Sequence, residues 1–312
     1  MSNNSLNLPS IRKNDISNLN TKRANIVTLD LSNKSGINQL MKKKSENLKE
    51  QFSDKKKGSL DLVLMGDLTG SMATYHQLLK TEFIKLSREL FQFIPDLQIG
   101  IIFYLDHGQG DPYTTKVCKI TNDIQTIQEF IQRTPTGNGG DAKEAVEDAL
   151  YDAFQINWRP KVNRSIVLFG DASGKEPHEC PHQHSYFQIT KELYEKQVTI
   201  NSVYCRPGFS SQSLQALAPI RIGDFQKKVS NLSHPNFFSW LANVTGGMII
   251  GIQEVGDLIE IIKASAAKDA GVLDEYEASI SKSTSKKKLE LIEISKKANQ
   301  RKLENSNRLR LE

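Results

Sequence analysis

Short apolar runs alternate along the chain with segments in which apolar residues recur every three or four positions. The short runs are bounded by turn residues and predict buried strands at 60–66, 97–104, 165–169, 198–204 and 248–252, with a returning edge strand at 114–120. The periodic segments predict amphipathic helices at 72–93, 124–131, 141–154, 186–196 and 235–244, and a last helix that ends near residue 266. Strands that alternate with helices predict an α/β fold, a doubly wound and mostly parallel open sheet with helices on both faces.

The two ends of the chain differ from this central part. Residues 1–57 are rich in Asn, Ser and Lys and hold no aromatic residue before Phe52, so they bury too little apolar area to offset their conformational entropy. We expect a flexible polar arm at 1–57, one domain at 58–266 and a charged helical tail at 267–312. The tail lacks sustained heptads, and its weak apolar stripe fits either a solvated helix or a short coiled coil. This stripe consists of Leu289, Ile292, Ala298 and Leu303.

Composition and charge exclude several classes of partner. The 41 basic and 36 acidic residues are interspersed, so the net charge of +5 predicts a solvated surface rather than a nucleic-acid interface. Three widely spaced cysteines imply no disulfide framework and favour a reducing compartment. The N-terminus shows no apolar signal segment, and no stretch approaches the length of a membrane span. We therefore expect a cytoplasmic protein that binds neither membranes nor nucleic acids.

The segment that follows the first predicted strand carries the clearest candidate chemistry. Its sequence is Asp-Leu-Thr-Gly-Ser-Met, with oxygen-bearing side chains at Asp67, Thr69 and Ser71. The carboxyl ends of strands are where open α/β sheets place their ligand sites, and three oxygen side chains on one tight loop suit a hard cation such as Mg²⁺. A capping role for Thr69 or Ser71 at the start of the next helix is the alternative that requires no metal.

Two later loops extend this pattern. A glycine-rich segment, 137–145, contains Asp141, and the strand at 165–169 leads to Asp171. In this order the three loops resemble the metal-ion-dependent adhesion site of von Willebrand factor A (vWA) domains. The resemblance covers about two-thirds of the chain, from near residue 59 to near residue 266. It is greatest to intracellular vWA domains of the kind attached to alpha-kinases, which share D-x-T-G-S-M, a D-H pair after the second strand (Asp106-His107 here) and G-G-D-x-x-E-A.

The resemblance implies a set of metal ligands and a non-catalytic function. Thr69 and Ser71 would bind Mg²⁺ or Mn²⁺ directly, and Asp67 and Asp171 would bind it directly or through water. Asp141 takes a position at which many relatives have Thr, and its added charge should strengthen cation binding. The same charge should weaken the attraction of the ion for an acidic side chain of a protein partner, which is the expected bridge.

Two neighbouring acids have simpler interpretations. Glu144 lies one turn beyond Asp141 and is interpreted as a helix N-terminal acid that the helix dipole favours, rather than as a ligand. A hydrogen-bonded turn is the favoured interpretation of Asp106-His107 with Asp111, ahead of a secondary metal site.

The sequence leaves two other classes of function open. The likeness to vWA domains of alpha-kinases suggests a regulatory or accessory subunit of a kinase or of another complex. Asp67-Leu68-Thr69-Gly70-Ser71 also looks like the D-K-T-G-T loop of ion-pumping ATPases, which would make Asp67 the nucleophile of an aspartyl phosphotransferase. Lys175 stands where that enzyme class needs a second acid, so a protein that is not an enzyme is favoured.

The segment from His178 to His184 suggests a different metal. It gathers three of the six histidines and one thiol, Cys180, within seven residues. Imidazole and thiolate ligands favour Zn²⁺. The spacing matches no closed tetrahedral set and no second Cys/His cluster is nearby in sequence, so a surface loop is the favoured interpretation.

Overall fold

The computed structural model describes residues 55–108, 110–217, 221–252, 254–280 and 286–311. The predicted polar arm at 1–57 therefore lies almost entirely outside the described residues. Among those residues, none of the helices has both the length and the apolar character that crossing a bilayer requires.

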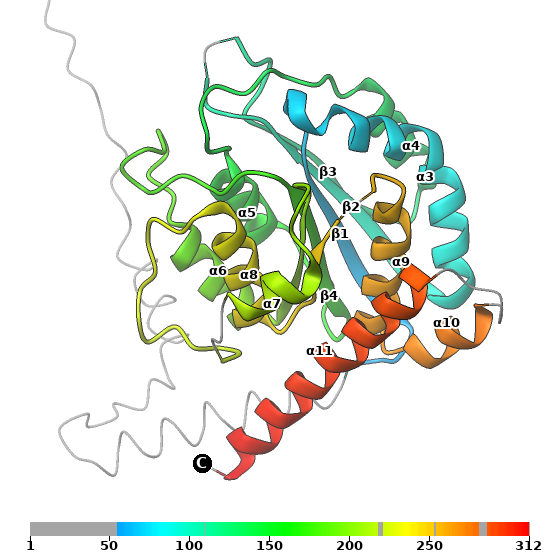
Figure 1. The fold of residues 1–312 in the computed structure, drawn as a ribbon. Coiled ribbons are helices and arrows are strands. Elements are labelled where there is room, and N and C mark those ends of the chain that lie inside the picture. The colour runs from blue at the N-terminus through cyan, green and yellow to red at the C-terminus, as the bar shows by residue number, and fades with distance from the viewer. Residues whose placement is uncertain (1–54, 109, 218–220, 253, 281–285, 312) are drawn as a thin grey trace, which may run out of the picture. The chain divides into compact units, whose positions relative to one another are not determined.

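A six-stranded sheet forms the centre of the described part of the chain (Figure 1). Its strands lie in the order β3-β2-β1-β4-β5-β6, and only the β2–β3 pair is antiparallel. The strands are β1 (Ser59–Asp67), β2 (Asp96–Tyr104), β3 (Thr115–Thr121), β4 (Asn163–Gly170), β5 (Val198–Tyr204) and β6 (Ile249–Gly251). This arrangement confirms the predicted α/β fold with a mostly parallel sheet.

Helices cover both faces of the sheet. One face carries α3 (Ala73–Phe93), α4 (Ile124–Arg133), α9 (Asp257–Asp269), α10 (Leu273–Ser279) and α11 (Lys286–Leu311). The other carries α5 (Val146–Gln155), α6 (Tyr186–Glu195), α7 (Ser211–Ala216) and α8 (His234–Thr245). In β1, Leu62 and Leu64 pack in the first core and Val63 and Met65 in the second. Because successive strand residues point to opposite faces, a strand buried on both faces is mostly apolar, and the run of apolar residues from Leu62 to Met65 made β1 recognisable in the sequence.

The strand order brings the loops after β1 and β4 side by side. Gly66 in β1 pairs with Phe169 in β4, and Asp67 pairs with Tyr104 in β2. A side chain at Gly66 would be impossible, because its Cβ would lie 2.1 Å from Cζ of Phe169. Strand β1 lies where the order of the sheet reverses, between β2 and β4, which is the place at which doubly wound sheets form ligand crevices.

The charged C-terminal segment joins the core through α10 and α11. In α11, Ile292 and Ala298 of the predicted weak stripe are buried in the core that contains α9, whereas Leu289 and Leu303 are exposed. The neighbouring Leu291 is also fully buried. The stripe that packs is therefore displaced from the one that the sequence predicts.

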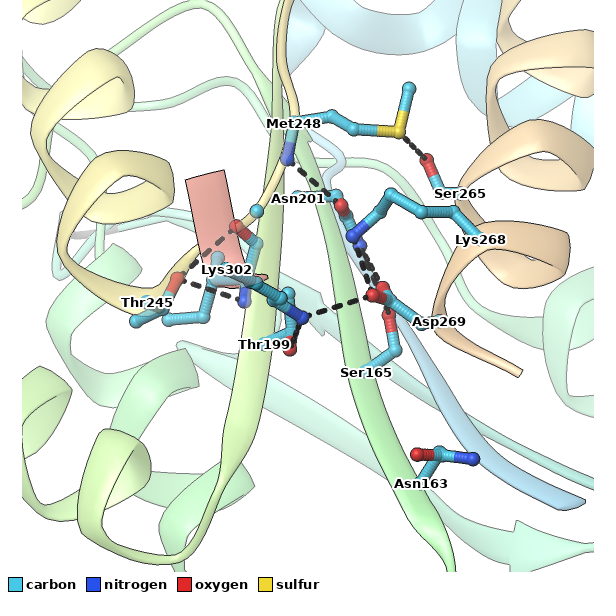
Figure 2. Close-up of polar contacts among 12 residues, drawn as sticks. Asn163, Ser165, Thr199, Asn201, Thr245, Met248, Ser265, Lys268, Asp269 and Lys302 are labelled. Atoms are coloured by element: carbon cyan, nitrogen blue, oxygen red, sulfur yellow. Dashed lines mark hydrogen bonds and ion pairs between the residues drawn. The ribbon is translucent and has the colours of Figure 1, made fainter. Parts of the chain in front are cut away.

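A buried polar network also joins α11 to the sheet (Figure 2). The carboxylate of Asp269, at the end of α9, accepts hydrogen bonds from Asn201 Nδ2 (2.7 Å) and Ser165 Oγ (2.8 Å). It also pairs with the ammonium groups of Lys268 (2.5 Å) and of Lys302 in α11 (3.4 Å). One carboxylate thus contacts groups from α9, α11, β4 and β5.

Candidate metal centre

The loop after β1 places its oxygen atoms in a continuous chain. Asp67 Oδ1 accepts hydrogen bonds from the Thr69 amide (2.8 Å) and the Thr69 hydroxyl (2.6 Å). Thr69 Oγ1 lies 3.4 Å from Ser71 Oγ, which donates to Asp171 Oδ1 at 3.2 Å. The structure therefore brings together four of the five predicted ligands, from the carboxyl ends of β1 and β4.

The capping alternative for the two hydroxyls is not observed. Thr69 precedes η1 (Gly70–Met72), which is one turn of 3-10 helix, and the Thr69 side chain makes no capping hydrogen bond. Helix α3 begins at Ala73, and the side chain of the preceding Met72 makes no capping hydrogen bond either. The hydroxyls of Thr69 and Ser71 are directed to the carboxylates instead.

Asp141, the fifth predicted ligand, lies at the rim. Its carboxylate is mostly exposed and accepts hydrogen bonds from Lys175 Nζ (2.7 Å) and the Lys143 amide (2.7 Å). Burial opposes ionisation of this group, but the bond from Lys175 holds the pKa of Asp141 below its usual range. Lys175 is itself buried and also pairs with Asp106 at 2.9 Å. Its ammonium group thus holds Asp141 and Asp106 together.

Glu144 occupies the position nearer to the first loop. Its side chain is buried, and a Cβ built on Gly139 would lie 2.9 Å from Glu144 Oε1 and 3.4 Å from Thr69 Cγ2. Glutamate and threonine thus lie against the same glycine, whose φ of +74° is in the region that glycine favours. The Glu144 amide donates to the Ser173 carbonyl (3.0 Å), which fixes the loop against the segment after β4. The carboxylate is therefore an inward-facing group of this centre, and Glu144 lies before the N-cap of α5 rather than in the first turn of that helix.

Two carboxylate oxygens of the centre have no hydrogen-bond donor among the described residues. They are Asp67 Oδ2 and Glu144 Oε2, and both are buried. Burial raises the pKa of Asp67 to about 7, since the bonds from Thr69 offset it only in part and Asp171 and Asp106 add repulsion. Burial also raises the pKa of Glu144 to about 9, with further repulsion from Asp67 and Asp106. Burial and the neighbouring acids thus oppose the ionisation of both carboxyls, Lys175 offsets this at Glu144 only in part, and a bound cation would favour the ionised forms.

The turn after β2 supports the glycine-rich loop. The Asp106 carboxylate accepts a hydrogen bond from the His107 amide at 2.6 Å, as the turn interpretation predicts. Asp111 Oδ1 accepts from the Asn138 amide at 2.8 Å, and a Cβ on Gly137 would lie 2.3 Å from this same oxygen. Asp111 therefore holds the glycine-rich loop in place.

The composition of the centre suits a small hard cation. Hydroxyls and carboxylates are the ligands that Mg²⁺ prefers, and a divalent ion would give the unpaired oxygens of Asp67 and Glu144 a partner. Ser71 is exposed and Asp171 half-buried, so the site is open on that side while its carboxylate floor is closed.

A second group of possible metal ligands lies nearby. One set consists of Asp148, Cys180, His182 and His184, and an overlapping set of His107, Glu147, Asp148 and Cys180. In each set, one potential ligand atom per residue lies within 4.8 Å of those of the others. Sequence spacing could not reveal these sets, because Asp148 lies 32 residues before Cys180 and meets it only through the fold.

Comparisons with known proteins find limited similarity. No family model matches the chain. Alpha-protein kinase vwkA of Dictyostelium discoideum is 27% identical over 136 residues, which are 42% of this chain and 21% of the kinase. The chain thus spans about a fifth of the length of the curated relative that it matches. Among solved structures, the conserved hypothetical protein BatB from Bacteroides thetaiotaomicron is similar over 68% of this chain and 100% of its own, with a TM-score of 0.45 and 14% identity.

Proposed function

We propose that this chain is a non-catalytic vWA-type interaction module that binds Mg²⁺, or Mn²⁺, at the carboxyl ends of β1 and β4. The observation that carries the proposal is the pair of buried oxygens without donors, Asp67 Oδ2 and Glu144 Oε2, beside the hydroxyls of Thr69 and Ser71. Buried polar atoms are nearly always paired, so two carboxylate oxygens without donors, from residues that both contact or adjoin Thr69, support a role in binding a cation.

The side chains divide into a floor and a rim in this proposal. Thr69 and Ser71 would hold the ion through their hydroxyls, with Asp67 and Asp171 binding directly or through water. Glu144 would complete the buried side in the place first assigned to Asp141. Asp141 would have to leave Lys175 to reach the ion, so we assign it to the rim.

The open side of the site is where a protein partner would bind. Ser71 is exposed and Asp171 half-buried, so a carboxylate of a partner has access to an ion held between them. The ion would attract that carboxylate as a Lewis acid, whereas Asp141 at the rim would repel it. Lys175 tempers this repulsion through its ion pair with Asp141.

Burial of Asp67 argues against the phosphotransferase alternative. A nucleophilic aspartate must meet its phosphoryl donor, but Asp67 is fully buried and its Oδ1 is already bonded to Thr69. The similarity to an alpha-protein kinase favours a different second candidate, in which the module accompanies or regulates a kinase.

Calorimetric titration with Mg²⁺ and Mn²⁺ tests the site directly. We expect one ion per chain, and weaker binding in Ser71→Ala, which deletes one oxygen without adding bulk. A lost contact to a charged group costs about 1.5–3 kcal/mol, which corresponds to roughly tenfold to a hundredfold in affinity. Thr81→Ala is the matched control, because the hydroxyl of Thr81 is exposed and bonds only within α3. Equal affinity in Ser71→Ala and wild type would exclude Ser71 as a ligand.

Partner capture then separates a bridging ion from a structural one. Wild type, Ser71→Ala and Thr81→Ala are each used as bait with Mg²⁺ and with chelator. A bridging ion predicts partners that bind wild type and Thr81→Ala only with Mg²⁺ and that Ser71→Ala loses. Partners that persist with chelator would show that another surface carries recognition, even if the ion binds.

A further inference from the structure

Four potential soft-metal ligands meet where the first turn of α5 faces the loop between β4 and α6. The buried carboxylate of Asp148 lies 2.7 Å from His182 Nδ1 through Oδ2 and 2.6 Å from His184 Nδ1 through Oδ1. Cys180 Sγ lies 3.5 Å from the same Oδ1. The four ligand atoms all fall within 4.8 Å of one another. We call these four residues the α5 cluster.

The loop that carries three of these ligands is held in shape by its own contacts. The Cys180 amide donates to the Glu176 carbonyl (3.0 Å), and the Gln183 amide donates to the Cys180 carbonyl (2.9 Å). Gln183 has a φ of +57°, so the chain turns sharply between His182 and His184. This turn lets both histidines reach Asp148, although a single residue separates them in sequence.

Negative charge at the cluster lacks a permanent positive partner. Glu147 and Asp148 are adjacent and both buried. In the part of the chain that the structure describes, the side chains that form ion pairs with their carboxylates are all histidines: His107, His182 and His184. Two neighbouring buried carboxylates are costly unless cations compensate them. These histidines carry a positive charge only when protonated, whereas a bound divalent cation would compensate the carboxylates in either state.

The geometry points to Zn²⁺ as that cation. We propose that Asp148, Cys180, His182 and His184 form a closed structural zinc site. Zn²⁺ takes four ligands of this kind in a tetrahedron with bonds of about 2.0–2.3 Å, which places ligand atoms about 3.3–3.7 Å apart. Each histidine–Asp148 pair needs to open by roughly 1 Å to admit the ion, and Cys180 is already at a suitable distance. A thiolate and two imidazoles select Zn²⁺ over Mg²⁺ and Ca²⁺.

Neighbouring side chains fix the orientation of the ligands. The ring of Tyr151 stacks on His184 with centroids 4.1 Å apart, and His107 meets His182 edge-on at 5.8 Å. His107 Nε2 is in turn bonded to Glu147 Oε1 at 2.9 Å. Such outer partners hold metal ligands in their binding orientation.

This zinc site would also stabilise the centre proposed for Mg²⁺. The segment from Asp171 to Cys180 joins the two, and the Lys175 amide donates to Glu147 Oε2 at 2.8 Å. Because Zn²⁺ would join this segment to α5, it would hold Asp171 and Lys175 in place. The role assigned to zinc is therefore structural and independent of whether Mg²⁺ binds.

Zinc content of the purified 312-residue chain tests the proposal. The chain is incubated with equimolar Zn²⁺, dialysed against metal-free buffer and analysed by plasma mass spectrometry, with affinity measured by competition with a chromophoric chelator. We expect one Zn²⁺ per chain, and affinity at least tenfold weaker in Cys180→Ser and in His182→Ala. His178→Ala and Cys118→Ser are the matched controls, since one removes a histidine of the same loop and the other a buried thiol outside the cluster.

Cobalt substitution gives a second readout, in which the spectrum of wild type is informative by itself. Co²⁺ in wild type should show the visible absorption of a tetrahedral site together with a thiolate-to-metal charge-transfer band, and Cys180→Ser should lack that band. Sub-stoichiometric zinc in wild type, unchanged affinity in both cluster variants, or an octahedral cobalt spectrum would each overturn the proposal. So would loss of zinc in Ser71→Ala, because the ion would then belong to the other centre. If a cluster variant fails to fold, the cobalt spectrum of wild type decides alone.

Discussion

Replacing Asp269 by Asn perturbs the buried network that joins α11 to the sheet (Figure 2). The substitution preserves shape and leaves an amide oxygen for Ser165 and Asn201, but it removes the charge opposite Lys268. The side chain of Lys268 is fully buried, so its ammonium group would lose its principal counter-ion without gaining water. Lys302 is partly exposed and can turn to solvent.

The expected loss of stability follows from this burial. Removing one partner of a buried ion pair costs about 3–5 kcal/mol, because the remaining charge is uncompensated. In a domain of about 250 residues, each kcal/mol lowers the melting temperature by roughly 2–4 °C, so we expect a fall of about 6–20 °C. Most of this loss of stability comes from the uncompensated charge of Lys268, since the side-chain amide oxygen in Asp269→Asn can still accept hydrogen bonds from the sheet.

The dependence on pH gives the same interaction a second signature. Burial alone would raise the pKa of Asp269, but Lys268 and Lys302 outweigh it and lower the pKa to about 2. A carboxylate with a depressed pKa stabilises the fold above its unfolded pKa of about 3.9 and loses that contribution as pH falls toward about 2. The Asn variant should therefore show less additional destabilisation than wild type between pH about 4 and about 2.

Urea unfolding followed by circular dichroism at neutral and acidic pH measures both effects. Asp274→Asn is the matched control, because Asp274 is exposed and its replacement should change stability by less than about 0.5 kcal/mol. The double variant Lys268→Met with Asp269→Asn should recover most of the loss, because it removes the uncompensated ammonium group and keeps an amide oxygen for Ser165 and Asn201. A loss below about 1 kcal/mol in Asp269→Asn, or a double variant as unstable as the single one, would refute the reasoning.

Three further predictions concern the first centre and the backbone. Mg²⁺ at a hundredfold excess over Kd should raise the melting temperature by about 5–11 °C, an effect absent from Asp67→Ala if that carboxylate helps to hold the ion. Burial raises the pKa values of Asp67 and Glu144 to about 7 and about 9, so Mg²⁺ must displace protons when it binds, and its affinity should increase from pH 6 to pH 9. Calorimetry in buffers of different ionisation enthalpy would detect the released protons. An affinity for Mg²⁺ that does not change with pH would contradict this prediction. Gly247→Ala should destabilise the fold severely, since its Cβ would lie 1.9 Å from the Ile200 carbonyl oxygen, whereas Gly256→Ala, with no atom within 4 Å, should be tolerated in a thermal melt.

The sequence predicted the strands and helices whose burial produces a regular pattern of apolar residues. Strand β1 carries the continuous apolar run from Leu62 to Met65 because both faces are covered, and α3 shows a regular stripe because one face packs on the sheet. Helix α7 was missed, since six residues inside an irregular region give no periodic pattern. In α11 the expected stripe was displaced, because a highly charged helix offers few apolar residues and its docking surface decides which of them are buried.

The candidate site was predictable only where its residues are contiguous. Asp67, Thr69 and Ser71 lie on one loop, and their mutual bonds follow from that spacing. Whether Asp141 or Glu144 faces that loop depends on Lys175 and on the turn at Gly139, which are tertiary features. A motif therefore identifies a loop more reliably than it identifies which acid of the loop points inward.

The segment that leads into α5 and the first turn of this helix contribute carboxylates to the two proposed sites, and their surroundings explain why we propose different cations for them. Glu144 faces hydroxyls and other carboxylates, whereas Asp148 faces two imidazoles and a thiol. A helix N-terminus stabilises negative charge by less than about 2 kcal/mol, which cannot compensate three buried acids within five residues. Lys175 supplies its ammonium group to Asp106 and Asp141 and only its backbone amide to Glu147. The charge that remains is divided between an all-oxygen site and one with sulfur and nitrogen ligands, so a hard and a soft ion can occupy them without competing.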